Sequence, residues 1–465
     1  MKPTFASPRR QFWILLATVL GSSVAILDGT IVNLALPKIA SDLHIHFASL
    51  QWIVDGYLLS LSALILLGGS LGDILGRKKV YLTGLVGFGI SSVLCAMSPN
   101  AVFLISARVL QGLFGALLVP GALAIINTSF APQARSKAIG QWTAWSSIAI
   151  VLAPLIGGSV LEVASWRWIF FINIPLIIGC FALAAPSIID SKDSEPRHID
   201  IAGAAFAGLG LAGLTYGLIE GPARHWSTIP LVLLCAGAAL LAIFLAWEAR
   251  TKDPMVKLSL FKSRNFVGSN LMTFAMYGAL SGFTFSLMIY LQTRMHYSSI
   301  AAGFSIVPTS ILLMTFSGKI GALAGRFGPR PFMTAGPLIA ASGMGLLYFL
   351  QPGASYVLGV LPGILLFGIG MTLLVSPLTT TVMASVSDAN SGIASGINNA
   401  VARAAGLIVI ALLGFLGSAH AYTFAASFCA ILAASGGVLS YFIIESRALA
   451  RKLRTGKIQP IQTGK

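Results

Sequence analysis

The chain has 465 residues, of which 56% are hydrophobic and only 9% are charged. A soluble domain carries about 25% charged residues, so this chain has too little charge to cover a water-facing surface. The composition excludes an ordinary soluble protein and predicts an all-α, polytopic membrane protein. The 49 Gly residues fit this class, because small residues let membrane helices approach closely.

Fourteen apolar stretches are long enough to span a bilayer, at roughly 20 residues each. They lie at about 12–36, 51–70, 80–97, 101–123, 139–161, 168–187, 201–219, 229–248, 266–291, 300–325, 332–350, 355–377, 393–418 and 422–444. An even number of spans puts both termini on one side of the membrane. We interpret Met1–Gln11 as a short basic tail rather than a signal peptide, because the apolar run after it is long enough to span.

The Lys and Arg residues determine the predicted orientation. Of the 30, 24 fall in alternate segments that include both termini, and only 4 fall in the other segments. Basic loops stay in the cytoplasm, so we expect cytoplasmic termini and a location in the cytoplasmic (inner) membrane, surrounded by the lipid bilayer. Topology then explains the net charge of +16, and no nucleic acid is predicted as a partner.

A short motif occurs twice, at a constant offset of 249 residues. The two copies are Gly69, Gly72, Gly76 and Arg77, and Gly318, Gly321, Gly325 and Arg326. Many transporters are built from two such halves, with the substrate site at their interface. The repeat predicts two six-helix pseudo-repeat bundles, at 1–190 and 265–446. An inserted helix pair with a cytoplasmic linker would occupy 191–264, and a basic cytoplasmic tail 447–465.

Asp28 closes the first apolar run and lies inside a predicted span. A carboxylate there costs several kcal/mol unless it has a partner, faces water or is protonated. At ~1.5 Å per residue, Asp28 lies about 13 Å below the outer end of its helix, and Arg108 about 10 Å down the fourth span. We expect the two to pair, or to share waters, when Asp28 is ionised. Protonation would then free Arg108; a permanent interhelical salt bridge is the alternative.

Asp55 is a second acidic residue within a predicted span. It lies about 6 Å from the outer end of the second span. Three interpretations fit this position: a second proton site, an attractor of cations at the outer mouth, and a solvated residue at a helix end.

Two segments rich in small residues are predicted to take part in conformational change. In the loop after the second span, glycines permit a tight turn, and Asp73 can accept from backbone N–H groups or pair with Arg77. In the fifth span, Pro154 bends the helix beside a smooth face. The residues assigned to gating are Gly69, Gly72, Asp73, Gly76, Arg77, Ala153, Pro154, Gly157 and Gly158. The alternatives are a basic loop that only sets topology and ordinary small-residue packing.

These motifs together resemble the major facilitator superfamily. The glycine loop is similar to the superfamily's signature between helices 2 and 3, and Leu104–Gly112 to its helix 4 motif, whose Arg is implicated in proton coupling. The fifth span resembles the antiporter motif, except that Ala149 and Ala153 stand where Gly is expected. With fourteen spans, Leu27–Pro37 and Trp166–Pro175 resemble the fourteen-helix drug:H+ antiporter subfamily. The resemblance covers essentially the whole chain.

The resemblance implies a multidrug efflux transporter that exports hydrophobic, often cationic, drugs or toxic compounds by alternating access. Its partners would be protons and a small amphipathic substrate, and the proton gradient would be its energy source without a cofactor. The chain contains no Walker-type phosphate loop, which argues against ATP, and no catalytic triad, so no enzyme is expected. A dedicated exporter of one metabolite and a non-transporting membrane sensor are the alternatives. The short outer segments offer no obvious docking domain, and the sequence leaves open whether a periplasmic adaptor binds.

Polar and aromatic residues within the spans are the candidates for the substrate cavity. Arg403 lies mid-membrane, one turn after Asn399; it would coordinate substrate, balance charge across the cavity, or pack against backbone carbonyls. Aromatic faces suit a flat or cationic ligand. The predicted cavity residues are Asn33, Gln111, Trp142, Trp145, Tyr277, Asn399 and Arg403.

The four Cys residues all fall inside apolar runs. We expect free thiols packed as small hydrophobic side chains, without a disulfide framework. The His residues are scattered, so no metal site is predicted.

Overall fold

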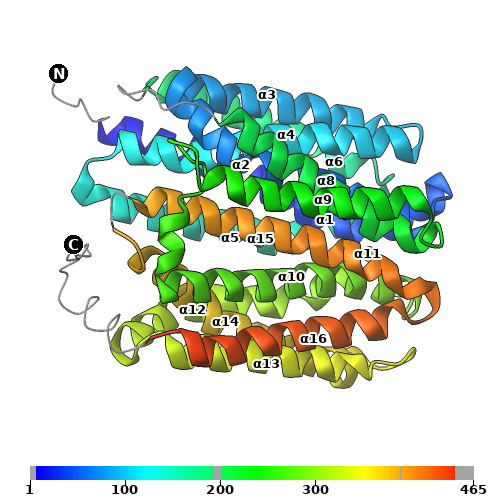
Figure 1. The fold of residues 1–465 in the computed structure, drawn as a ribbon. Coiled ribbons are helices and arrows are strands. Elements are labelled where there is room, and N and C mark those ends of the chain that lie inside the picture. Colours follow the sequence, from blue (N-terminus) through cyan, green and yellow to red (C-terminus); the bar gives the residue numbers. More distant parts are fainter. Residues whose placement is uncertain (1–6, 193–199, 388–389, 446–465) are drawn as a thin grey trace. The chain divides into compact units, whose positions relative to one another are not determined.

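The computed structural model describes residues 7–192, 200–387 and 390–445, so the predicted tail at 447–465 lies outside the described residues. Within this part of the chain, every regular element is helical (Figure 1). Twelve helical segments there are long and apolar enough to cross a membrane. Two further predicted spans fall on α5 (Pro132–Val163) and α13 (Arg330–Tyr348), which are helices but are not among the twelve. The chain is thus an all-α, multi-pass membrane protein, and the predicted number of fourteen spans is not confirmed.

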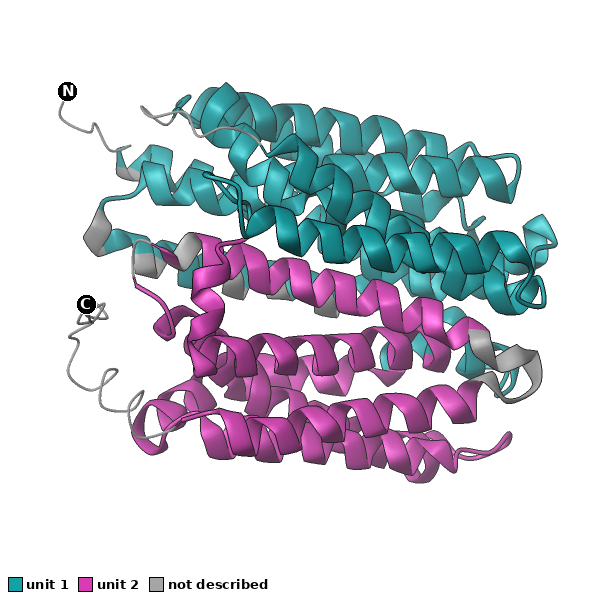
Figure 2. Ribbon diagram, viewed as in Figure 1, with its two compact units in different colours: residues 1–255, 288–304 teal, residues 256–287, 305–465 magenta. Residues whose placement is uncertain are grey.

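The helices form two compact units, shown in Figure 2. Unit 1 comprises residues 1–255 and 288–304, and unit 2 comprises residues 256–287 and 305–465. The division runs through α10 (Arg264–Thr293) and just before the end of α11 (Ser299–Ser305). The end of α10 therefore belongs with the first nine helices, and the predicted domain boundaries stay a prediction.

Unit 1 is built around α1, α3, α4 and α7. Its helices are α1 (Pro8–Leu43), α2 (Phe47–Leu75), α3 (Arg77–Ala96), α4 (Ala101–Ser129), α5, α6 (Trp168–Phe171), α7 (Asn173–Ser187), α8 (Ile201–Ala223) and α9 (Thr228–Glu248). The buried Tyr81 of α3 donates its hydroxyl to the Ala17 carbonyl of α1 at 3.0 Å. A phenol in an apolar core needs such a partner, so this bond fixes α3 against α1.

The contact between α2 and α4 depends on two glycines that bring backbones together. A Cβ at Gly68 would lie 2.2 Å from the Ala116 carbonyl oxygen, and one at Gly112 would lie 2.2 Å from that of Tyr57. Any side chain at either position would push the helices apart. Gly69, by contrast, has room, because its nearest neighbour would be 3.8 Å away. The tight position beside the predicted motif is therefore Gly68.

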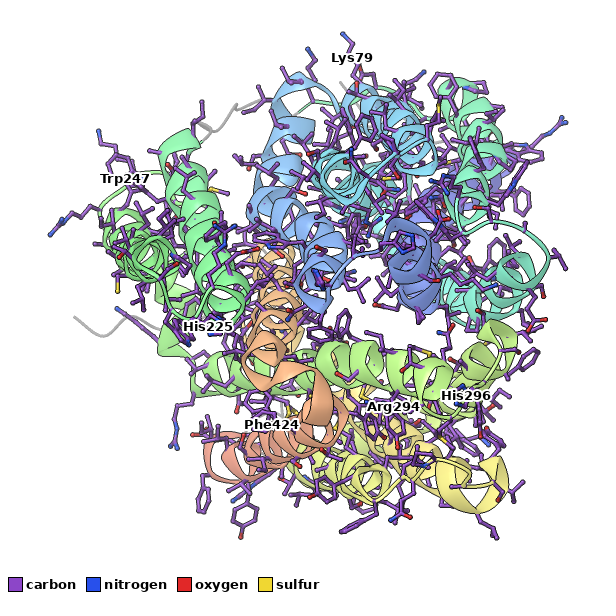
Figure 3. All side chains as sticks on the ribbon, turned by 90° about the vertical axis from the view of Figure 1, so that its right-hand side faces the viewer. Lys79, His225, Trp247, Arg294, His296 and Phe424 are labelled. Carbon is purple, nitrogen blue, oxygen red and sulfur yellow. The ribbon has the colours of Figure 1, made fainter. Side chains whose placement is uncertain are left out.

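The helices α8 and α9 form a pair that packs on α2. A Cβ at Gly213 would lie 2.7 Å from the Leu233 carbonyl oxygen, so α8 and α9 are in close contact. Trp52 of α2 donates its indole N–H to Glu220 of α8 at 3.0 Å. Glu220 also accepts from Arg224 at 2.8 Å, and this bond raises the pKa of Arg224. In the side-chain view, the labelled Trp247 lies on the outer side of the pair (Figure 3).

Unit 2 is a second helical bundle. Its elements are η1 (Leu258–Lys262), most of α10, α12 (Val307–Phe327), α13, η2 (Tyr356–Val360), α14 (Leu361–Ala384), α15 (Ser391–Leu412), η4 (Leu413–Leu416) and α16 (Gly417–Ile443). A Cβ at Gly370 of α14 would lie 2.4 Å from the backbone nitrogen of Ala340 of α13. Tyr422 of α16 donates its hydroxyl to the Leu347 carbonyl of α13 at 2.9 Å. Thus α13 is held on two sides.

The four cysteines are free thiols in the structure. Cys95, Cys180 and Cys429 are buried, as predicted. Cys235 of α9 is exposed, so the prediction of a packed side chain is wrong for this residue. The reason is that α9 packs mainly on α8 and leaves most of its surface outside the bundle.

Candidate functional site

A buried ion pair joins α1 and α4. Arg108 Nη1 donates to Asp28 Oδ2 at 2.5 Å, and both side chains are 1% exposed. The predicted contact between these two residues is confirmed. Taking either charge out of water alone would be very costly, so each charge makes the other tolerable.

Three neutral side chains complete the surroundings of the Asp28 carboxylate. Its second oxygen, Oδ1, accepts from Gln111 Nε2 of α4 and from Asn173 Nδ2 of α7, each at 3.0 Å. Ser92 Oγ of α3 accepts from the same two amides, at 2.8 Å from Gln111 and 3.2 Å from Asn173. The carboxylate therefore links α1 to α4 and α7, and the same amides extend the network to α3.

Arg108 has acceptors other than Asp28. Its Nη1 donates to Gln111 Oε1 at 2.6 Å, and its Nε donates to the Ile53 carbonyl of α2 at 3.1 Å. The guanidinium carbon also lies 4.4 Å from the centre of the Tyr57 ring, a cation–π distance. Arg108 is thus anchored to α2 and α4 even without the carboxylate of α1.

Local sequence explains how these groups meet. Arg108 and Gln111 are three residues apart on α4, so they share one face of that helix. Asn173 begins α7 directly after the break at Ile172, which separates α7 from the four-residue α6. The break divides the predicted span at 168–187 and puts a polar amide at a helix start inside the bundle.

Asp55 of α2 is isolated from this network. The residue is 0% exposed, and neither carboxylate oxygen has a hydrogen-bond partner among the described residues. The interpretation of Asp55 as a solvated residue at a helix end is therefore wrong. A buried carboxylate without a hydrogen-bond partner is costly in its charged form, so Asp55 stays a candidate for the second proton site.

The turn between α2 and α3 contains a second charge pair. Arg77 donates to Asp73 Oδ1 from Nε at 3.0 Å and from Nη2 at 2.7 Å. Gly76 between the two helices has φ +108°, and a Cβ there would lie 2.6 Å from Asp190 Oδ1. Arg77 N also donates to the Ser191 carbonyl at 3.1 Å. The turn is thus fastened to the segment after α7, and Gly76 is required by both conformation and space.

The predicted smooth face of α5 contacts α1 and α11. A Cβ at Gly157 would lie 2.6 Å from the Ile31 side chain, and one at Gly158 would lie 2.6 Å from Ile300 Cα. Ala153 is fully buried and Pro154 is buried beside it. A Cβ at Gly303 would lie 2.9 Å from Pro154 Cβ. Small residues on both helices therefore allow α11 to lie directly on α5.

A shallow recess of about 370 Å³ lies at the ends of α1, α5 and α10. Its lining residues are Pro37, Lys38, Ser41, Glu162, Gln292, Tyr297, Ser298 and Ser299. Lys38 Nζ donates to the Leu161 carbonyl near the end of α5. Gln292 Nε2 donates to the Leu34 carbonyl at 3.0 Å, which ties the end of α10 to α1. Between α10 and α11, burial raises the pKa of Tyr297.

The predicted cavity residues of unit 1 have varied surroundings. Gln111 is fully buried within the ion-pair network. Asn33 donates to the Gly29 carbonyl at 3.0 Å, and its Oδ1 has no partner among the described residues. Trp142 donates to Ser22 Oγ at 3.1 Å, and Trp145 packs against the core. The structure therefore brings only Gln111 to the Asp28–Arg108 pair.

The other three predicted cavity residues belong to unit 2. Asn399 donates to the Ser395 carbonyl of its own helix at 3.0 Å. Arg403 is half-buried and has no hydrogen bond or ion pair with a described residue, so packing against backbone carbonyls is not observed. Tyr277 of α10 lies close enough to Arg403 for the two groups to interact electrostatically.

Sequence reasoning missed the two residues that complete the site. The sequence shows Asn173 only as one residue of a longer motif, and Ser92 belongs to no motif. The available signal was the position of Asn173, an amide directly before Ile174 and Pro175 at a helix start. Ser92 gives no such signal, because Ser is common in membrane helices and usually bonds its own backbone.

An all-helical bundle of candidate spans that encloses a buried ion pair is typical of a polytopic membrane transporter. The chain belongs to the Major Facilitator Superfamily, whose family model matches residues 18–411. Membership in this family of membrane transporters is consistent with a protein that is not an enzyme.

Several curated relatives of the chain are resistance proteins by name. It is 31% identical to the puromycin resistance protein pur8 of Streptomyces alboniger, over 95% of this chain and 93% of the relative. It is 32% identical to the multidrug resistance protein Stp of Mycobacterium tuberculosis (strain CDC 1551 / Oshkosh), over 87% and 76%. Among solved structures, a POT family transporter in complex with 5-aminolevulinic acid is similar, with a TM-score of 0.73. It is 14% identical and covers 96% of this chain and 97% of the other, which shows the shared fold.

Proposed function

We propose that this protein is a proton-driven antiporter that exports drugs or antibiotics across the cytoplasmic membrane by alternating access. The observation that carries the proposal is the buried Asp28–Arg108 pair, a titratable contact that holds three helices together. The resistance proteins among its relatives support export as the direction.

Protonation of Asp28 is the proposed coupling step. The ionised carboxylate accepts three hydrogen bonds, from Arg108, Gln111 and Asn173. A proton on Oδ2 would face the Arg108 N–H, so the charge attraction and the shortest of the three hydrogen bonds would both be lost. Arg108 would keep Gln111 and the Ile53 carbonyl, and so would stay with α2 and α4. Protonation would therefore loosen α1 from α4, because only the two amide hydrogen bonds at Oδ1 remain, while the positions of α2 and α4 relative to each other are kept.

The two gating segments would respond to this release. The Asp73–Arg77 pair fastens the turn after α2, and the small residues of α5 support α1 and α11. In our proposal these contacts stabilise one of the two conformations of the alternating-access cycle, and their loss permits the change to the other conformation. Asp55, buried without a partner, is a candidate for a second proton site.

The substrate is proposed to be a small amphipathic compound, hydrophobic and cationic, bound near Asn399, Arg403 and Tyr277. Fourteen spans, cytoplasmic termini and the absence of a cofactor remain parts of the proposal, as does the predicted pairing of two pseudo-repeats. An adaptor protein is not part of it. A dedicated exporter of one natural product is the second candidate, since pur8 is by name a resistance protein for one antibiotic.

The test is transport by the full chain in proteoliposomes with an imposed pH gradient. We expect the wild type to move a fluorescent cationic dye and to release protons in exchange. Asp28→Asn should abolish both signals, because an amide cannot alternate between charged and neutral forms. The matched control is Asp42→Asn on the same helix, whose carboxylate is half-exposed and pairs with Arg167 at 2.7 Å.

Full dye export by Asp28→Asn, or equal loss in Asp42→Asn, would rule out the proposed coupling. Competition by many unrelated drugs favours the multidrug exporter. Competition by puromycin alone favours the dedicated exporter. A wild type that moves neither dye, puromycin nor protons would leave the sensor as the better interpretation.

A further inference from the structure

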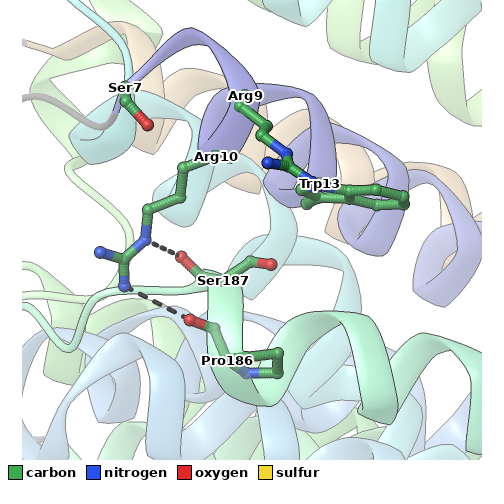
Figure 4. Close-up of a pocket in the computed structure, with 6 residues that line it drawn as sticks. All are labelled: Ser7, Arg9, Arg10, Trp13, Pro186 and Ser187. Carbon is green, nitrogen blue, oxygen red and sulfur yellow. Dashed lines mark hydrogen bonds between the residues drawn. The ribbon is translucent and has the colours of Figure 1, made fainter.

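A second charged recess lies at the start of α1, far along the helix from Asp28. It has a volume of about 330 Å³ and is open to the surroundings. Its lining residues are Ser7, Arg9, Arg10, Trp13, Pro186 and Ser187 (Figure 4). Two arginines therefore line this recess, and none of its described lining residues carries a carboxylate.

The two arginines are held differently. Arg10 Nε donates to the Ser187 carbonyl at 2.7 Å, and Nη2 to that of Pro186 at 3.4 Å. These bonds fix Arg10 against the last turn of α7 and leave its remaining N–H groups for another acceptor. Arg9 is exposed and has no partner among the described residues. In Figure 4 its side chain extends along the same face of α1 as Trp13.

The surroundings of the recess suit the boundary between lipid headgroups and acyl chains. Trp13 is 37% exposed, and its ring centre lies 5.2 Å from that of Phe12, itself 49% exposed. Exposed aromatic rings of this kind gather at headgroup level. On α7, Ile178 lies eight residues before Pro186, on the same face of the helix, and is 63% exposed. The cationic recess thus continues into an apolar surface along α7.

We propose that this recess binds the phosphate group of an anionic phospholipid, with Arg9 and Arg10 on the phosphate and Trp13 beside the glycerol region. Two guanidiniums can share the two non-bridging oxygens of one phosphodiester in fork geometry, and no carboxylate among the described lining residues competes for them. The apolar surface of α7 then accommodates an acyl chain, which a soluble anion lacks. Under the proposed orientation this is a lipid of the inner leaflet, although the site itself does not depend on transport.

The test uses the full chain in phosphatidylcholine nanodiscs that contain a lipid with brominated acyl chains. Bromine quenches nearby tryptophan fluorescence, and Trp13→Phe isolates the contribution of Trp13 from that of the other seven tryptophans. We expect brominated phosphatidylglycerol to quench Trp13 more strongly than brominated phosphatidylcholine at the same mole fraction. Arg9→Gln should lower this preference about five-fold, since each basic residue near an anionic surface contributes a factor of that order.

Arg9→Gln is the decisive variant, because Arg9 supports no described part of the fold. Arg10→Gln should add a further factor of about five. The matched control is Arg264→Gln at the start of α10, an exposed arginine paired with Glu445 at 3.5 Å, which should leave the preference unchanged. Equal quenching by the two lipids, or equal effects of Arg9→Gln and Arg264→Gln, would overturn the proposal.

Inorganic phosphate distinguishes the source of the phosphate group. At constant ionic strength, we expect millimolar phosphate to leave the quenching by phosphatidylglycerol unchanged. Displacement of the lipid by phosphate would overturn the assignment to a lipid and identify a site for free phosphate.

Discussion

The buried polar groups of the two units differ in charge. Unit 1 encloses the ion pair of Asp28 and Arg108, with amide and hydroxyl partners. In unit 2, Asn398 of α15 donates to Thr273 Oγ1 at 2.6 Å and to Asn270 Oδ1 at 3.3 Å, and all three side chains are neutral. Both networks join helices within a bundle, but only the first contains a group that titrates. Under the proposed function, we therefore assign proton coupling to unit 1 and a packing role to the unit 2 network.

Removal of Arg108 is expected to have the largest effect on stability, and it tests whether the charged network of unit 1 differs from the neutral network of unit 2. Arg108→Ala would leave the Asp28 carboxylate buried without its countercharge, at a cost of about 3–5 kcal/mol. We expect a large drop in the unfolding temperature in detergent micelles at neutral pH, and partial recovery at low pH, where Asp28 takes up a proton. A loss that does not depend on pH would contradict an ionised Asp28.

The double variant Asp28→Asn/Arg108→Gln separates the effect of the ion pair on stability from its effect on transport. With both charges gone, no uncompensated charge remains, so the stability loss should be smaller than for Arg108→Ala alone. Transport should still be absent. The pair of measurements, unfolding temperature and dye export, therefore separates the structural from the coupling role. Restored transport in the double variant would remove the coupling role.

The two copies of the glycine motif are expected to respond to a Gly→Ala substitution with stability changes of opposite sign. Gly76 has φ +108° and no space for a Cβ, so Gly76→Ala should destabilise unit 1 by about 1–3 kcal/mol. Gly325, its counterpart in the sequence, lies within α12, and a Cβ there would have no described neighbour within 4 Å. Gly325→Ala should stabilise the helix by about 0.5–1 kcal/mol. Unfolding temperatures that shift in the same direction would contradict this assignment.

The smallest expected effect concerns the neutral network. Asn398→Ala removes the donor to Thr273 and Asn270 and should cost about 0.5–1.5 kcal/mol. Because no charge is involved, the change in unfolding temperature should be the same at pH 5 and pH 8. The pH profile of transport should also keep its shape. A shifted profile would give unit 2 a part in proton coupling.

The sequence predicts a structural feature well where one physical constraint, such as the cost of a charge inside a membrane helix, acts on few residues. The depth of Asp28 and Arg108 along their helices was enough to predict their contact, because a charge in a membrane helix has few alternatives. The same reasoning placed Asp55 near an outer helix end but could not show its burial, which depends on the packing of neighbouring helices. The tight turn at Gly76 was predicted from its motif.

Other features depend on packing between distant segments. Asn173 and Ser92 reach Asp28 because α3 and α7 lie beside α1, which no local pattern encodes. The second copy of the motif looks equivalent in sequence, yet the glycine with positive φ that follows α12 is Gly328, three residues beyond Gly325. The assignment of residues 288–304 to unit 1 likewise reflects contacts of Gln292 and Gly303 with α1 and α5.

The exposed Cys235 gives the chain a natural labelling position. The other three thiols are 0% exposed, so a thiol-reactive fluorophore applied in detergent should modify one position on α9. This helix pairs with α8, and α8 is joined to α2 by the Trp52–Glu220 bond. A fluorophore at Cys235 of α9 would therefore report movements of the α8–α9 pair and of α2, the helix that contains Trp52 and Asp55. Such labelling requires no cysteine to be removed and none to be introduced.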